Sequence, residues 1–368
     1  MAIIRPMPRE PPVTTATFPE TSNSVSDSAK RELMGPDASA RSVPALRVAT
    51  VDGVTTTYEP GTSRYADLDG ELHYTDHGGP AGAPLLVCVH GLGGSSVNWI
   101  AVAPLLTDAF RVLAPDLAGH GRTLAGTRTT DVNANQRLLD RFLREVSGTP
   151  AILIGNSMGG LISLLQAGRN PETVAGLVLV DPALPREQRK LPDREVAARF
   201  ALAALPLVGE RYMAKQRRQR TPERLVAETL ALCCVDPSRV PAPVVAALVD
   251  LARERTSQHG TIAAYLGAAR SIVKIMARPK ALLARIDRVN QPTLLISGDQ
   301  DRLVPVAAAR AMAARRPEWR YEERAGIGHV PQLEDPEWTA ATIHDWLAKE
   351  AAGAARAASA ADTPEPPR

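Results

Sequence analysis

The stretch Gly155-Asn156-Ser157-Met158-Gly159 constrains the fold of this chain more than any other part of the sequence. An apolar run at 151–154 precedes it and an apolar segment at 160–167 follows it, which indicates a short buried strand, a sharp turn and a helix. The glycines two residues before and after Ser157 remove side chains that would collide with the returning helix. The pattern predicts a nucleophile elbow, in which Ser157 takes a strained backbone conformation and presents its hydroxyl.

A serine nucleophile needs a general base. The chain has seven histidines, and only His329 lies late in the sequence in a loop after a plausible strand, at 319–324. Gly326 and Gly328 precede this histidine and Pro331 follows it, so the loop is expected to stay open. His329 is therefore the predicted base.

The base in turn needs a carboxylate to orient it. The turn after the predicted strand at 292–297 offers two candidates, Asp299 and Asp301. Asp299 comes directly off the strand and is typical of a turn former whose carboxylate bonds N–H groups two residues on. Asp301 lies deeper in the loop and can reach the histidine loop from the neighbouring strand, so it is the favoured acid. Asp181 is the reserve, although we interpret it first as a cap for the turn that it forms with Pro182.

The chain order Ser157, Asp301, His329 is that of the α/β hydrolases. A His90-Gly91 pair follows the apolar run 85–89, as an oxyanion loop does in that superfamily. Roughly residues 60–350 therefore resemble the α/β-hydrolase superfamily. The resemblance implies an oxyanion hole made by the backbone N–H groups of Leu92 and Met158. In the same light Asp116, His120 and His90 are interpreted as structural residues that fix loops near the site.

The predicted fold class is α/β. The strand-like runs are apolar throughout and alternate with helical stretches, which favours a mostly parallel central sheet flanked by helices on both faces. The resemblance adds a helical cap inserted after the sixth strand. The expected division is a disordered N-terminal tail at 1–45, hydrolase core at 46–182 and 286–350, a helical cap at 183–285, and a disordered C-terminal tail at 351–368.

The predicted cap carries an excess of positive charge. It contains 19 Lys and Arg against 9 Asp and Glu, a balance of +10, whereas the whole chain is only +3. The densest cluster is Lys215-Gln216-Arg217-Arg218-Gln219-Arg220, which follows the apolar run 200–208. A weak contact of the cap with an anionic membrane surface is one interpretation, a funnel for acidic substrates is another, and a solvated surface is the simplest.

Composition excludes several classes of protein. The three cysteines, Cys88, Cys233 and Cys234, cannot build a disulfide framework and have no metal-ligand spacing with histidine, so a reduced, cytoplasmic location is the simplest inference. No signal-peptide core and no uncharged run of membrane-spanning length occurs in the sequence. Nucleic-acid binding is not expected, because no recognised module is present and the cap offers few aromatic residues. Neither a metal nor an organic cofactor is expected.

The sequence therefore predicts a serine esterase or lipase-like enzyme that acts on a small-molecule ester with an apolar acyl group. Dehalogenases and epoxide hydrolases of this superfamily carry aspartate at the nucleophile position, where this chain has Ser157. Two alternatives stay open: a carbon–carbon bond hydrolase of ring-cleavage products, which would use the same three residues, and a non-catalytic ligand-binding receptor on the same fold. Acyl transfer to an acceptor other than water stays open as well.

Overall fold

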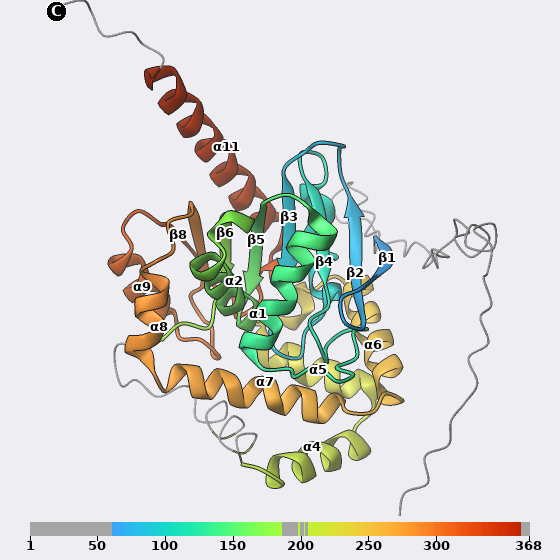
Figure 1. The fold of residues 1–368 in the computed structure, drawn as a ribbon. Coiled ribbons are helices and arrows are strands. Elements are labelled where there is room, and N and C mark those ends of the chain that lie inside the picture. The colour runs from blue at the N-terminus through green and yellow to red at the C-terminus, as the bar shows by residue number, and fades with distance from the viewer. Residues whose placement is uncertain (1–60, 186–197, 199–201, 203–204, 362–368) are drawn as a thin grey trace, which may run out of the picture. The chain divides into compact units, whose positions relative to one another are not determined.

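A computed structural model of the protein describes residues 61–185, 198, 202 and 205–361, with the side chains of 351–361 excepted. The predicted N-terminal tail at 1–45 lies outside these residues. The described chain forms one eight-stranded sheet in the order β1-β2-β4-β3-β5-β6-β7-β8 (Figure 1). The strands are β1 (Thr62–Asp67), β2 (Glu71–Gly78), β3 (Leu85–Val89), β4 (Arg111–Pro115), β5 (Ala151–Asn156), β6 (Val174–Val180), β7 (Thr293–Gly298) and β8 (Arg320–Arg324).

The sheet is mostly parallel, as predicted. The pairs β1–β2 and β2–β4 are antiparallel, and all pairs from β4 onward are parallel. Alternate residues of one strand enter two separate cores: Val87 and Val89 on one face of the sheet, Leu86 and Cys88 on the other. Because both faces are buried there, the central strands β3, β5, β6 and β7 are mostly apolar runs that do not alternate with polar residues.

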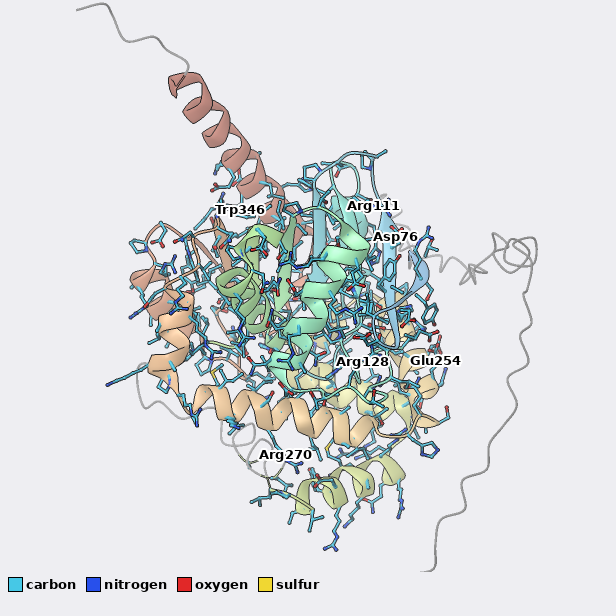
Figure 2. The ribbon with its side chains drawn as sticks, viewed as in Figure 1. Asp76, Arg111, Arg128, Glu254, Arg270 and Trp346 are labelled. Carbon is cyan, nitrogen blue, oxygen red and sulfur yellow. The ribbon has the colours of Figure 1, made fainter. Side chains whose placement is uncertain are left out.

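Helices cover both faces. The first face is covered by α1 (Val132–Arg141), α2 (Met158–Arg169) and α9 (Val306–Arg315). The second face is covered by short 3₁₀ turns and by α11 (Pro336–Ala361), whose Trp346 is buried against the strands (Figure 2).

The C-terminal tail predicted from residue 351 is wrong in part, because α11 continues through it to Ala361. The segment is rich in alanine, the residue with the highest helix propensity, and it extends a helix already started in the core.

Five described helices lie between β6 and β7, where the cap is predicted. They are α4 (Val208–Gln219), α5 (Pro222–Cys233), α6 (Ala242–Thr256), α7 (Thr261–Met276) and α8 (Pro279–Ile286). The predicted end of the cap at residue 285 falls inside α8, whose Leu282 and Ile286 join the first core. No described helix combines the length and apolar character that crossing a membrane requires.

Candidate active site

Ser157 occupies the turn between β5 and α2 with φ 54° and ψ −115°, a conformation that residues with a side chain rarely adopt. Its N–H donates to Val180 O at 3.1 Å, and its carbonyl accepts from the N–H groups of Leu161 and Ala183. These bonds fix the turn at both ends while the serine side chain stays half-buried. The geometry is that of an elbow with a strained apex.

The two flanking glycines are required for different reasons. A Cβ on Gly155 would lie 2.7 Å from the backbone of Gly159, at the start of the returning helix. A Cβ on Gly159 would lie 2.0 Å from Val89 O, so this glycine makes room for the end of strand β3. The predicted clash with the helix therefore applies to the first glycine, and the second one accommodates the neighbouring strand.

His329 and Asp301 are brought together by the ends of neighbouring strands β7 and β8. The distance between His329 Nδ1 and Asp301 Oδ2 is 2.7 Å, and both side chains are buried. The other oxygen of Asp301 accepts from the N–H groups of Leu303, at 2.7 Å, and Val304, at 3.0 Å. The carboxylate is thus held by its own loop with one oxygen aimed at the imidazole.

Asp299 has a different partner from the one expected. Its carboxylate accepts from the N–H of Gly326 at 2.7 Å, in the histidine loop, and not from an N–H two residues on. The predicted local turn bond is made by Asp301 instead, to Leu303. The turn residue of the pair is therefore the acid that faces His329, and Asp299 ties the two loops together.

Asn156 links the elbow to the histidine loop, which sequence reasoning missed. Its amide Nδ2 donates to the carbonyls of Val180 and His329, each at 3.1 Å. This bond places the His329 backbone beside the residue that precedes Ser157. The signal in the sequence is a polar residue at the end of an otherwise apolar strand, and its partner could not be read from spacing.

Asp181 lies against the same pair. It is buried, its backbone φ is 42°, and its carboxylate accepts from the N–H of Gly298 on β7 at 3.2 Å. The predicted role of Asp181 as a cap for its own turn is therefore wrong, because its carboxylate bonds the neighbouring strand. Burial and the neighbouring Asp301 carboxylate raise the pKa of Asp181 well above its usual range. Protonated Asp181 would relieve the repulsion between two buried carboxylates.

Asp181, Asp301 and His329 are also the one group among the described residues that could hold a metal ion, with ligand atoms within 4.8 Å of one another. Backbone N–H groups already donate to both carboxylates, at Gly298 and at Leu303. These donors compensate negative charge without a cation, so the arrangement suits an orienting carboxylate at least as well as a metal site.

The loop after β3 lies close to the elbow. A Cβ on Gly91 would stand 3.1 Å from the Cβ of Ser157, so the backbone of this loop passes directly beside the serine. Met158 begins α2, and its N–H is one of the four that a helix leaves without an intrahelical acceptor. Leu92 follows Gly91 in the close-approaching loop, which keeps both backbone groups as candidate oxyanion donors.

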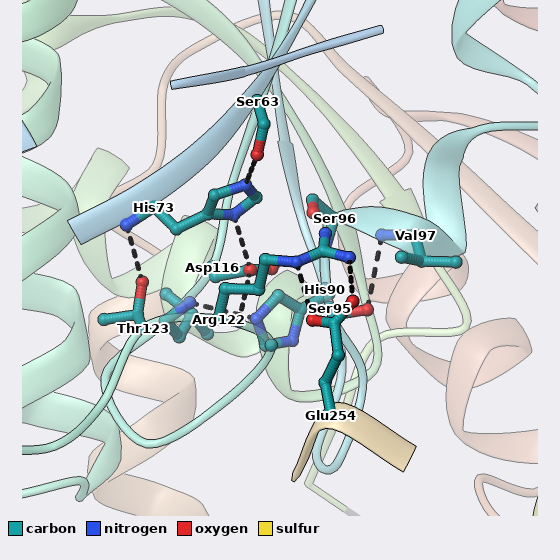
Figure 3. A network of polar contacts seen from close by, with 12 residues as sticks. Ser63, His73, His90, Ser95, Ser96, Val97, Asp116, Arg122, Thr123 and Glu254 are labelled. Atoms are coloured by element: carbon teal, nitrogen blue, oxygen red, sulfur yellow. Dashed lines mark hydrogen bonds and ion pairs between the residues drawn. The ribbon is translucent and has the colours of Figure 1, made fainter. Parts of the chain in front are cut away.

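A buried polar network fixes the loops beneath this site (Figure 3). Asp116 accepts from His73 Nδ1 at 2.7 Å and from the N–H groups of Ser96, at 2.6 Å, and Arg122, at 2.7 Å. His90 bonds Gly91 O through Nδ1, at 2.8 Å, and accepts from the N–H of Leu117 through Nε2, at 3.0 Å. The loop-fixing parts predicted for Asp116 and His90 are therefore confirmed.

His120 belongs to the same layer. It is buried, its Nδ1 bonds Ala118 O at 3.1 Å, and its ring lies 5.3 Å from that of His90. Burial, reinforced by His90, lowers the pKa of His120 to about 3. A neutral, enclosed imidazole of this kind supports the loop.

Comparison with known proteins agrees with the architecture. The sequence pattern of the α/β hydrolase fold family matches residues 84–336. A pimeloyl-[acyl-carrier protein] methyl ester esterase of Aromatoleum aromaticum is 32% identical over 274 residues, which cover 71% of this chain and 97% of that protein. The mouse (Mus musculus) monoacylglycerol lipase ABHD6 is 27% identical over 77% of this chain and 82% of its own length.

A solved structure of a bacterial membrane phospholipase A is 28% identical, with a TM-score of 0.60 over 78% of this chain and 86% of that one. The mostly parallel sheet with helices on both faces, the serine elbow and these matches agree with one another. The chain belongs to the α/β hydrolase superfamily.

Proposed function

We propose that the protein is a serine hydrolase of carboxylic esters in which Ser157 is the nucleophile, His329 the base and Asp301 the orienting acid. The observation that carries the proposal is the 2.7 Å bond between His329 Nδ1 and Asp301 Oδ2. Asn156, the residue before Ser157, in turn donates a hydrogen bond to the carbonyl of His329. The chain is a hydrolase acting on ester bonds, in line with the esterase and lipase named among its relatives.

The proposed reaction gives each of the three residues one role. His329 Nδ1–H donates to Asp301, so its Nε2 is left to take the proton of Ser157 as the hydroxyl attacks the ester carbonyl. The developing oxyanion is held by the N–H groups of Leu92 and Met158, and the alcohol leaves with the proton from the imidazole. Water, activated by the same imidazole, then releases the acid from the acyl-enzyme.

The proposed substrate is an ester with an apolar acyl group, since the relatives named above act on an acyl methyl ester and on monoacylglycerol. Carbon–carbon bond hydrolysis would need a cap cation directed at a substrate carboxylate. Two cap arginines are engaged otherwise: Arg255 donates to the carbonyls of Gly119 and Gly121, and Arg217 donates to acceptors within the cap. Ester hydrolysis is the better supported reaction because the relatives named above are an esterase and a lipase.

The test combines active-site labelling with a substrate series. A fluorophosphonate probe should label wild type and not Ser157→Ala, because only an activated serine reacts. Wild type should hydrolyse p-nitrophenyl esters from acetate to palmitate, and Ser157→Ala should lose roughly a thousandfold or more in kcat. Labelling of Ser157→Ala would place the nucleophile elsewhere, and an unlabelled, inactive wild type would favour a binding protein on this fold.

A further inference from the structure

The described helix α4 packs against α7 on the side away from the sheet (Figure 1). Arg270 of α7 anchors it, donating to Glu210 Oε1 at 2.8 Å and to Leu205 O at 3.2 Å (Figure 2). Several other residues of α4 are exposed, and they determine what this helix can contact.

The turn that begins α4 exposes three large apolar side chains. Leu205 is 53% exposed, Leu207 70% and Val208 46%. Single exposed leucines are common on soluble proteins, but three within four positions form a contiguous apolar patch. Leu207 has a φ of 64°, in the left-handed region that branched side chains rarely adopt. An apolar side chain is therefore held outward at a position where glycine would be the expected residue.

Cations continue from this patch along one face of α4. Arg211, Lys215 and Arg218 follow Val208 at spacings of three, four and three residues, which places them on the same face of the helix. All three are exposed, and within the described part of the chain none forms an ion pair. Glu210, the one acid of α4, is bound to Arg270 on the opposite side.

The basic cluster predicted from the sequence divides into two sets. Arg217 donates to Thr261 Oγ1 and to the carbonyls of Arg255 and Thr256, so it holds the cap together. Arg220 pairs with Glu228 at 2.9 Å. The cations available to a partner are therefore Arg211, Lys215 and Arg218, and we call these with Leu205, Leu207 and Val208 the α4 face.

We propose that the α4 face docks on an anionic phospholipid bilayer. The apolar turn would enter the boundary between headgroups and acyl chains, while the row of cations would lie at the level of the phosphates. The chemistry is complementary, since the cap carries an excess of ten positive charges on a chain with a net charge of only +3.

The docking proposal rests on the proposed function in one respect: docking would bring an ester hydrolase to lipid esters. The α4 face lies close to the proposed site. The α4 helix packs on α7, and Tyr265 of α7 approaches Gly93 so closely that a Cβ there would lie 3.1 Å from its ring. Gly93 follows Leu92, the proposed oxyanion donor, so the docking helix is one layer from the site.

The experiment is co-sedimentation of the full chain with vesicles of phosphatidylcholine alone or with 30% phosphatidylserine. Wild type should bind the phosphatidylserine vesicles at low salt, release at high salt, and ignore phosphatidylcholine. Arg211→Gln/Lys215→Gln/Arg218→Gln should lower the partition coefficient by on the order of a hundredfold. Leu207→Ser should weaken binding while leaving its salt dependence intact, because it removes apolar contact and no charge.

A matched control removes the same charge elsewhere. Arg137→Gln/Arg288→Gln/Lys349→Gln changes exposed positions outside α4 and should bind vesicles nearly as wild type does. Equal loss in both triple variants would reduce the effect to net charge and overturn the proposal. Failure of wild type to sediment at low salt would also overturn the proposal. Dimers that form without lipid as the protein concentration rises, and that Leu207→Ser abolishes, would overturn it as well, because the α4 face would then bind a second copy of the chain.

Failure of the inference and failure of the proposed function give different results. Ser157→Ala should bind vesicles as wild type does, and the α4 triple variant should hydrolyse a short soluble ester at the wild-type rate. Vesicle binding without ester hydrolysis would refute the hydrolase and keep the docking face. Ester hydrolysis without vesicle binding would do the reverse.

Discussion

The strained backbone at Ser157 predicts that Ser157→Gly is more stable than Ser157→Ala. This is the reverse of the order expected at an unstrained position. With φ 54° and ψ −115°, the residue has the conformation of the first central position of a type II′ turn, which glycine occupies without cost. A residue with a side chain held in such a region costs about 1–3 kcal/mol. Glycine gives back about 0.4–1 kcal/mol through the greater freedom of the unfolded chain.

Ser157→Gly should therefore be more stable than Ser157→Ala by about 1–2 kcal/mol, or about 2–4 °C in Tm for a chain of this size. Thermal unfolding of the purified variants, followed by circular dichroism and checked by urea denaturation, measures the difference. At an unstrained position the order is reversed, with glycine less stable by about 0.4–1 kcal/mol. A glycine variant less stable than the alanine variant would refute the strained elbow.

Asp301→Asn should lower kcat by roughly three to four orders of magnitude, because an amide can hold the imidazole in the wrong tautomer. Asp299→Asn keeps an oxygen for its backbone donor and should change kcat by less than about tenfold, measured on p-nitrophenyl butyrate. Burial and the Asp301 carboxylate raise the pKa of Asp181, so its contribution to stability is full below its ordinary pKa of 3.8 and is lost as pH rises through the folded value. The Tm of wild type relative to Asp181→Asn should therefore fall as pH rises above 3.8. Arg217→Gln should cost about 1–3 kcal/mol of unfolding free energy, since it leaves partly buried acceptors without a donor, while Arg218→Gln should stay within about 0.5 kcal/mol of wild type.

Each of these outcomes has a counterpart that would contradict it. The opposite ranking of the two asparagine variants would assign the orienting role to Asp299, and near-normal rates in both would assign it to Asp181. A Tm difference for Asp181→Asn that does not change with pH would mean that the carboxyl titrates normally. Equal stability of the Arg217 and Arg218 variants would mean that the bonds of Arg217 within the cap contribute nothing.

The sequence predicted the sheet because parallel strands buried on both faces are continuous apolar runs, and the alternation of Leu86 and Val87 between two cores shows why. The proximity of His329 and Asp301 was predictable because each follows a strand, and parallel strands end at one edge of the sheet. The chain order Ser157, Asp301, His329 added the resemblance to the α/β hydrolases.

What could not be predicted are partners that spacing does not encode. Asp299 bonds Gly326, 27 residues away, and Asn156 bonds the carbonyl of His329, 173 residues away. Arg217 belongs by sequence to a basic cluster, yet its bonds run to the end of α6 and the start of α7. The hydrogen-bond partners of such side chains depend on how the helices and loops pack, which a single sequence does not reveal.

Contacts between the predicted cap and the core reach the proposed catalytic residues. The N–H of His329 donates to Cys233 O, at 2.6 Å, where α5 ends, and a Cβ on Gly328 would lie 2.3 Å from the same oxygen. On the other side of the site, Tyr265 of α7 approaches Gly93 in the proposed oxyanion loop. A displacement of α5 would therefore change the position of the proposed base, and a displacement of α7 would change the position of the proposed oxyanion loop. Since α4 packs on α7, a bilayer bound at the α4 face would contact a helix that rests on the helix beside the proposed oxyanion loop.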